Sequence, residues 1–411
     1  MMIFSNRVPA VMLTVLVMFA CSGCATARHP VPSELVQKAM VGNMDDIRYI
    51  MGQHDTAMQA SLVQSVKQER PEDFPITADG MKVYPVLAIS GGGANGAYGA
   101  GLLKGWSKEG SRPVFKVVTG VSTGALIAPF AFLGKDYDGQ IEKYYTTIST
   151  KDIMQSKGPL VILLGDSLAS NKPLADMVAC IADDEILAKI AAEHKRGRRL
   201  YVGTCNLDAQ KFVVWDMGAI AVRGDTELFR KVIVASAAIP VIFPPSIFKV
   251  EADGQPYDEL HTDGGTLTQV FGIYKLVEGM HGAAEGLGLD KSKIKAKLYI
   301  IRNGFMSPIY KQVDDKLASL AEKSFNTIID AQGAGDAYRI YAFMKERGND
   351  FNLAYIPADF KDDSKEMFDP VAMRKLFDRG YNDALHGYKW HKTPPGLTEH
   401  AAPAAKPADT K

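Results

Sequence analysis

Residues 82–101, KVYPVLAISGGGANGAYGAG, decide the fold of this chain. They begin with a short apolar run rich in β-forming residues, which is typical of a buried parallel strand. A glycine-rich loop follows, and residues 97–110 then show the apolar spacing of a helix that ends at Gly110. Residues 114–120, VFKVVTG, form a second strand pattern. This part of the chain therefore predicts a β-loop-α-β unit.

The chain beyond this unit continues the alternation. Apolar runs at residues 198–207, 211–217 and 295–303 are separated by helical patterns such as residues 226–238. Alternating strands and helices favour an α/β protein, with a three-layer α/β/α fold around a mostly parallel central sheet. We expect this core domain to span residues 80–350.

The segments outside the core have patterns of their own. Residues 24–79 predict a helical arm, because ELVQKAM, IRYIM and ASLVQSV place apolar residues at helical spacing. Residues 314–345 predict a helix that is interrupted at Gly333 and Gly335. We expect a strand and a helix within residues 351–392 to pack on the core, and the Pro/Ala-rich residues 393–411 to be disordered.

Composition excludes several classes of function. The chain has 411 residues, 46% of them hydrophobic, which is enough for a sizeable core. Its formal net charge is zero, so no overall field favours nucleic acid, and we expect no nucleic-acid partner. The sequence has no clustered His/Cys spacing of a metal site, and we expect no metal or organic cofactor.

The N-terminus has the pattern of a targeting segment. Arg7 precedes an apolar stretch at residues 8–20, which is too short to span a bilayer comfortably. CSGC at residues 21–24 resembles the lipobox of bacterial lipoproteins, although Cys21 stands where an aliphatic residue is preferred. This resemblance implies a signal peptide at residues 1–23, lipidation of Cys24 and a place in the bacterial cell envelope, on the periplasmic face of the outer membrane. A plain secretory peptide is the alternative.

Two cysteines remain after such a cleavage. Cys180 and Cys205 could form a disulfide in an oxidising compartment, or they could be two free thiols. Their positions in the sequence leave both possibilities open.

The glycine-rich loop admits two interpretations. Gly91, Gly93 and Gly96 satisfy the G-x-G-x-x-G pattern of a dinucleotide-binding loop. Such a fold places an acidic residue at the end of the second strand, where it binds a ribose hydroxyl. Here the second strand leads into GVSTG at residues 120–124 instead. Dinucleotide binding is therefore the remote alternative.

GVSTG is a G-x-S-x-G motif between a strand and a helical pattern, which is the context of a nucleophile elbow. Ser122 would lie on a sharp turn, and the glycines on either side would avoid collisions with the neighbouring elements. The N-terminus of the following helix favours the negative charge that develops during attack. Gly91, Gly92 and Gly93 could then direct backbone N–H groups at a transient oxyanion.

Four separated blocks resemble, in order, the patatin-like phospholipase family. The resemblance covers residues 83–302 and implies a serine acyl hydrolase, in which Gly91, Gly92 and Gly93 form the oxyanion hole. Ser122 is then the nucleophile and Asp263 completes a Ser–Asp dyad. In the third block we expect Ser236 to serve in packing or hydrogen bonding at a helix end. The blocks are GGGANG at residues 91–96, GVSTG at 120–124, ASAAIPVIFPP at 235–245 and DGG at 263–265.

Asp263 needs a suitable environment to act as a base. The ordinary pKa of an aspartate is about 3.9, so burial must raise it or the carboxylate must be held within reach of the serine hydroxyl. A simple D-G turn is the alternative interpretation of Asp263. His261 is a conceivable triad histidine, but we expect it to be exposed in a loop.

The sequence also departs from the family pattern. Asn95 replaces the usual Arg or Lys of the glycine-rich loop, and Gln269 and Phe271 replace Asn and Pro after the DGG block. These changes weaken any inference about the headgroup of the substrate.

The resemblance implies a lipid acyl hydrolase that cleaves carboxylic esters of phospholipids or related lipids through an acyl-enzyme. Its expected partners are a lipid or ester substrate and a membrane surface, which the N-terminal anchor would reach. The oligomeric state stays open, as does acyl transfer to an alcohol other than water. The alternative function is a non-catalytic envelope lipoprotein that binds lipid or protein with a hydrolase fold.

Overall fold

A computed structural model describes residues 28–397 except 43, 45, 52–55, 159–160, 163–164, 272–278, 280–281, 283–289 and 311. The predicted signal peptide, Cys24 and most of the predicted disordered tail lie outside the described residues. Within the described ranges, no helix combines the length and apolar character needed to cross a membrane.

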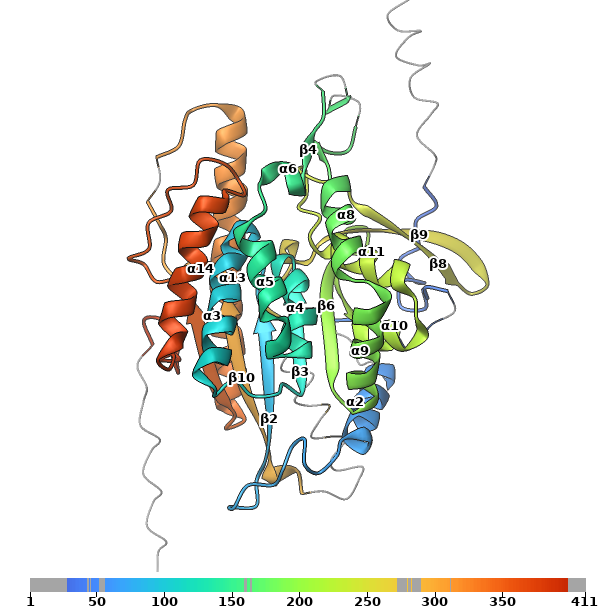
Figure 1. The fold of residues 1–411 in the computed structure, drawn as a ribbon. Coiled ribbons are helices and arrows are strands. Elements are labelled where there is room, and N and C mark those ends of the chain that lie inside the picture. Colours follow the sequence, from blue (N-terminus) through green and yellow to red (C-terminus); the bar gives the residue numbers. More distant parts are fainter. Residues whose placement is uncertain are drawn as a thin grey trace, which may run out of the picture.

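The centre of the molecule is a nine-stranded sheet with the order β1-β7-β6-β3-β2-β10-β11, which β8 and β9 extend beside β6 (Figure 1). Five strands, β6, β3, β2, β10 and β11, pair parallel with one another, whereas every pairing of β1, β7, β8 and β9 is antiparallel. The prediction of a mostly parallel sheet is therefore confirmed. The strands are β1 (Arg48–Ile50), β2 (Lys82–Ile89), β3 (Val117–Val121), β6 (Arg199–Asn206), β7 (Lys211–Asp216), β8 (Ser246–Ala252), β9 (Gln255–Asp263), β10 (Ile294–Arg302) and β11 (Asp350–Tyr355). A separate hairpin pairs β4 (Gln155–Ser156) with β5 (Ala169–Ser170).

Helices cover both faces of the sheet and complete the predicted three layers. Side chains alternate along each strand, so Leu87 and Ile89 of β2 lie in one core cluster, whereas Val86 and Ala88 lie in the other. The first cluster is covered by α3 (Gly96–Glu109), α4 (Thr123–Leu133), α5 (Asp138–Thr146), α8 (Lys172–Ile181), α9 (Asp184–Lys195), α10 (Met217–Arg223), α11 (Thr226–Ser236) and α14 (Pro370–Leu385). The second is covered by α2 (Thr56–Gln68) and α13 (Leu317–Glu346).

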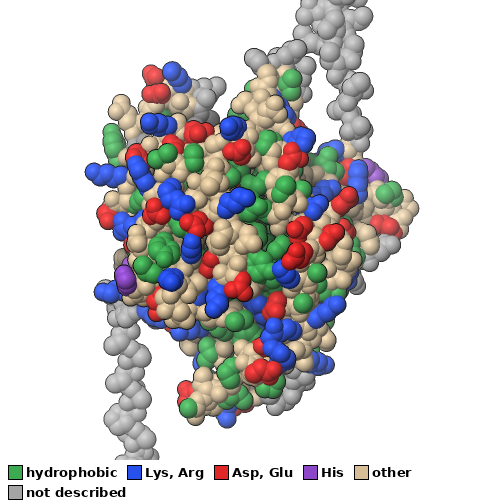
Figure 2. Space-filling model, in the orientation of Figure 1, with side chains coloured by type: hydrophobic (Ala, Val, Ile, Leu, Met, Phe, Trp, Pro, Cys, Tyr) green, Lys and Arg blue, Asp and Glu red, His purple; other side chains and the backbone are tan. Residues whose placement is uncertain are grey.

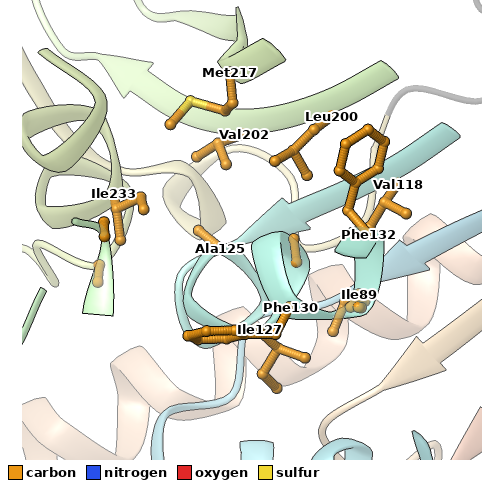
Figure 3. Close-up of a cluster of buried hydrophobic side chains, with 14 of the residues drawn as sticks. Ile89, Val118, Ala125, Ile127, Phe130, Phe132, Leu200, Val202, Met217 and Ile233 are labelled. Atoms are coloured by element: carbon orange, nitrogen blue, oxygen red, sulfur yellow. The ribbon is translucent and has the colours of Figure 1, made fainter. Parts of the chain in front are cut away.

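The larger core cluster holds the helix of the nucleophile elbow in place. In Figure 3, Phe132 of α4 lies beside Val118 and Leu200 of the sheet, and Ala125, Ile127 and Phe130 of α4 belong to the same core cluster as Val202. All of these side chains are at least 96% buried, so α4 is fixed against the sheet from its first turns onward. On the face drawn in Figure 2, basic and acidic side chains are interspersed, as the net charge of zero leads one to expect.

Two expectations about the flanking segments were wrong. In the predicted N-terminal arm, residues 34–38 form turns and residues 48–50 form β1, so α2 supplies the helix of the described arm. Because β1 pairs with β7, the backbone N–H and C=O groups of β1 form hydrogen bonds with the free edge of β7, which a helix could not do. The predicted interruption of the helix near residue 333 is also absent, since α13 is continuous from Leu317 to Glu346.

Gly333 has a packing role instead of breaking the helix. A Cβ atom at this position would lie 2.2 Å from the guanidinium of the buried Arg302. The glycine therefore lets the arginine side chain pass beside the helix.

Of the two possibilities for Cys180 and Cys205, a disulfide or two free thiols, the structure shows free thiols. Cys205 is buried in β6 and Cys180 is exposed on α8, and both are unpaired.

Candidate active site

Ser122 lies in the sharp turn between β3 and α4, at the carboxyl end of the parallel strands. Its φ and ψ angles are 55° and −124°, a positive-φ conformation that is rare for a residue with a side chain. A Cβ atom on Gly120 would lie 2.3 Å from the carbonyl oxygen of Gly124, and one on Gly124 would lie 2.3 Å from that of Ile89. Both glycines of the motif are therefore required by the closeness of the backbone.

A second serine, Ser236, holds this turn through hydrogen bonds. The N–H of Ser122 donates to Oγ of Ser236 at 3.0 Å, and the Ser236 hydroxyl donates to the carbonyl oxygen of Gly203 at 2.7 Å. Ser236 is the last residue of α11 and is fully buried. The expected hydrogen-bonding role of Ser236 at a helix end is confirmed.

Asp263 is the last residue of β9, and the fold brings it to Ser122 across 141 positions of sequence. Strand β9 pairs with β6, and the Asp263 N–H donates to the carbonyl oxygen of Ala238 at 2.9 Å. The carboxylate accepts a hydrogen bond from the N–H of Gly265 at 2.7 Å, and the Ser122 side chain lies close enough to lower the pKa of the carboxyl group. The fold therefore brings the predicted nucleophile close to the predicted base.

The environment of Asp263 favours a proton acceptor. The residue is 5% exposed, and burial raises the pKa of its carboxyl group from 3.8 to about 7, although Ser122 and the hydrogen bond from Gly265 act in the opposite direction. A group with a pKa close to neutrality can both take and return a proton. The geometry can therefore support removal of the serine proton by a carboxylate.

His261 does not belong to this pair. It was expected to be exposed, but it is completely buried, because β9 packs between β6 and β8 and the ring lies against Trp215 and Phe248. Its Nδ1 is 2.8 Å from Oγ1 of Thr204 and its Nε2 is 3.1 Å from Glu259. Burial lowers the pKa of the His261 ring, which is committed to this separate network.

The glycine-rich loop lies beside Ser122. Gly92 and Gly93 have φ angles of 151° and 55°, which favour glycine. Gly93 lines a pocket together with Ser122. A Cβ atom on Gly91 would lie 3.1 Å from Cβ of Ser122 and 2.4 Å from Oε1 of Gln269. The loop is therefore close enough to the nucleophile to supply backbone donors.

An apolar pocket opens at Ser122 and has a volume of about 620 Å³, including the part that is open to solvent. Helices α4, α5 and α8 form most of its wall, and Phe368 closes it from the C-terminal part of the chain. Apart from Gly93, Ser122 and Thr123, the lining residues are aliphatic or aromatic: Leu126, Phe130, Ile141, Tyr144, Tyr145, Ile148, Ile153, Leu174, Met177, Ile181, Ala237, Ile239, Phe243 and Phe368. In the sequence these residues look like ordinary core positions, so no local signal identifies the pocket.

A buried carboxylate that was not predicted from the sequence holds the loop that follows Asp263. Oδ2 of Asp336 accepts the N–H groups of Gln269 at 2.7 Å and of Val270 at 3.1 Å. Asp336 is 1% exposed and lies on α13, far from the motif in the sequence.

Of the other predicted site residues, Cys24 lies outside the described residues. The described part of the chain contains no group of acidic, His and Cys side chains arranged to hold a metal ion.

Comparison with known proteins finds a family model that matches the part of the chain around this site. The family model described as patatin-like phospholipase matches residues 87–271, which include Ser122 and Asp263. A solved structure, VipD from Legionella pneumophila, is similar with 13% sequence identity and a TM-score of 0.35, over 76% of this chain and 69% of that chain. No curated protein matches the chain. Residues 87–271 are thus similar to the patatin-like phospholipase domain.

Proposed function

We propose that this protein is a lipid acyl hydrolase that cleaves carboxylic esters with Ser122 and Asp263. The observation that carries the proposal is that these two buried side chains lie together at an apolar pocket, with Ser122 close enough to lower the pKa of Asp263. The match to the family model supports a lipid hydrolase in general. The dyad and the ester substrate are the finer part of the proposal.

In the proposed reaction, Oγ of Ser122 attacks the ester carbonyl carbon while its proton passes to Asp263. The carbonyl oxygen becomes an oxyanion, which backbone N–H groups of the Gly91 to Gly93 loop and the N-terminus of α4 stabilise. When the tetrahedral intermediate collapses, Asp263 returns the proton to the leaving alcohol. Water then attacks the acyl-enzyme, Asp263 takes a proton from it, and the serine hydroxyl and a carboxylic acid are released.

The pocket favours a substrate with a long acyl chain beside Ser122 over one with a short acyl group such as acetyl. Each buried methylene contributes about 0.8 kcal/mol of binding free energy. A wall made almost entirely of carbon favours chains over polar headgroups. Replacing Leu126 by Trp would fill part of the pocket, and we expect it to shift the preference of the enzyme towards shorter acyl chains.

We also propose that lipidation at Cys24 holds the enzyme at the periplasmic face of the outer membrane, where phospholipid is at hand. The support is the resemblance of residues 21–24 to a lipobox. Cys24→Ser is expected to move the protein from the membrane fraction to the soluble fraction of cells and to leave the activity on a soluble ester unchanged. Equal membrane association of both proteins would contradict the anchor.

The proposed activity is tested by release of fatty acid from mixed phospholipid vesicles and of p-nitrophenol from its esters. We compare wild type with Ser122→Ala, Asp263→Asn and the control Ser324→Ala, which removes an exposed hydroxyl from α13. Activity in wild type and the control, with loss in both dyad variants, is the expected result. Wild-type activity in Ser122→Ala, or an inactive wild type, would refute the proposal.

A further inference from the structure

Asn303 connects the C-terminal part of the fold to the glycine-rich loop. It directly follows β10, is 1% exposed and lies outside residues 87–271, which the family model matches. Its backbone N–H donates to Oγ of Ser90 at 2.8 Å, and its Nδ2 donates to the carbonyl oxygen of Ser90 at 2.9 Å. Its Oδ1 accepts the N–H of Gly99 in α3 at 3.1 Å. One side chain therefore fixes both the start of the loop and the helix that follows it.

The loop is also fitted closely around Asn303. A Cβ atom on Gly92 would lie 2.0 Å from the carbonyl oxygen of Asn303, and one on Gly99 would lie 2.4 Å from its Oδ1. Real Cβ atoms do not approach so closely, so these two positions are restricted to glycine by Asn303. The Ser90 hydroxyl that receives the Asn303 N–H in turn donates to the carbonyl oxygen of Gly91 at 2.7 Å. The contacts thus extend from Asn303 to the peptide units proposed to bind the oxyanion.

We propose that Asn303 is a positioning residue that sets the direction of the backbone N–H groups in the Gly91 to Gly93 loop. The inference rests on the proposed hydrolase function. Oxyanion donors are effective when they are held in place before charge develops, because a loop that must reorganise gives up part of the stabilisation. Asn303 contacts the loop and not the reacting atoms, so its loss is expected to slow the chemical step while substrate binding in the apolar pocket persists.

The test needs a control that separates positioning from stability. Asn352 on β11 is a matched residue, because it is 2% exposed and its Nδ2 donates to a backbone carbonyl, that of Leu298, at 2.8 Å. Its hydrogen bonds go to β10 and Lys392 rather than to the glycine-rich loop. Asn303→Ala and Asn352→Ala should therefore lose comparable stability, because each loses two side-chain hydrogen bonds.

The measurements are kcat and KM for a p-nitrophenyl ester and the urea midpoint of each variant. We expect kcat to fall about 10- to 100-fold in Asn303→Ala, with KM changed less than about three-fold, because small displacements of catalytic groups cost rates of this size. We expect Asn352→Ala to keep a kcat within about two-fold of wild type. If Asn303→Ala and Asn352→Ala have the same kcat, Asn303 is only structural and the inference is wrong.

Two milder variants keep the test decisive if Asn303→Ala does not fold. Asn303→Asp retains the shape and the acceptor for Gly99 but loses the Nδ2 donor to the Ser90 carbonyl oxygen. Ser90→Ala loses the hydroxyl that lies between the backbone N–H of Asn303 and the carbonyl oxygen of Gly91. Both are expected to lower kcat by about 3- to 30-fold without a matching change in KM. A normal kcat in both variants of an active enzyme would overturn this inference alone. An inactive wild type would overturn the proposed function and, with it, the inference.

Discussion

Strand β9 carries two buried carboxylates, Glu259 and Asp263, in opposite electrostatic environments. Glu259 is 1% exposed and accepts hydrogen bonds from Arg48 and His261. Burial alone would raise its pKa, but these partners hold it at about 2. Asp263 is 5% exposed, its carboxylate accepts a hydrogen bond from the N–H of Gly265, its neighbour Ser122 is uncharged, and burial raises its pKa to about 7.

The difference shows how one strand supplies both a structural carboxylate and a proposed base. A cation beside a carboxylate stabilises the charged form and removes its tendency to take a proton. Within the described ranges, Asp263 forms no salt bridge, and its only partners are the serine and a backbone N–H. The proposed basicity of Asp263 therefore depends on burial without a neutralising partner, and four experiments can test this contrast.

The largest effect is expected on the rate of ester hydrolysis. Asp263→Asn removes the group that accepts the serine proton, so kcat/KM should fall by about 10²- to 10⁴-fold, which is the usual contribution of general base catalysis. Glu259→Gln, a change of the same chemistry on the same strand, should keep the kcat/KM of the folded enzyme. If both variants lose activity to the same extent, the two carboxylates do not differ in function.

For folding stability, the larger loss is expected in Glu259→Gln rather than in Asp263→Asn. Glu259→Gln leaves Arg48 as a buried cation with no carboxylate partner, and loss of one member of a buried ion pair typically costs about 3–5 kcal/mol of unfolding free energy. Urea denaturation at neutral pH measures this loss. A Glu259→Gln variant as stable as wild type would show that the Arg48–Glu259 pair adds nothing to the fold.

The pH dependence of stability should distinguish wild type from Asp263→Asn. A carboxyl group with a pKa of 3.8 in the unfolded chain and about 7 in the native protein binds its proton more tightly in the native state. Between these pH values the unfolded state binds fewer protons, so this group makes the native protein less stable as the pH rises. The full change corresponds to roughly 4 kcal/mol.

Asp263→Asn lacks this titration, so its stability relative to wild type should increase between about pH 4 and about pH 7 and then level off, as urea midpoints can show. A difference between the two proteins that does not change with pH would contradict a raised pKa at Asp263.

The smallest effect is expected at a third buried carboxylate, Asp336. Burial raises its pKa, but two backbone N–H groups and the exposed Arg339 bond to it, so its carboxylate is committed to structural contacts and is not a candidate base. In Asp336→Asn, an amide oxygen can still accept both N–H groups, and we expect a stability loss of about 1 kcal/mol and a change in kcat below about three-fold. A loss of activity as large as that of Asp263→Asn would assign Asp336 a part in the chemistry.

Local motifs made much of this site predictable from the sequence. The strand, glycine-rich loop, helix and second strand of residues 82–124 follow from apolar periodicity, and the glycines beside Ser122 mark its sharp turn. The contact with Asp263 could be expected only from the family resemblance, because the two residues lie 141 positions apart. The raised pKa of Asp263 depends on what surrounds it in space, which the sequence alone did not specify.

The missed features depend on contacts between distant segments. Residues 48–50 form a strand because β7 offers an edge, and His261 is buried because β9 packs between β6 and β8. Asn303 and Asp336 belong to no motif, yet they bond to the loops that flank the site. The pocket combines apolar residues of several helices with Phe368, and each of them resembles a normal core residue in the sequence.

The most direct test of the account is the rate at which a fluorophosphonate labels the protein as a function of pH, with mass spectrometry to locate the label. We predict a single label on Ser122, a rate that rises with pH to half its maximum near the pKa of about 7 given for Asp263, and labelling at least about 100-fold slower in Asp263→Asn. The absence of a label on Ser122, or equal labelling of both proteins at every pH, would contradict the claim that Asp263 activates this serine.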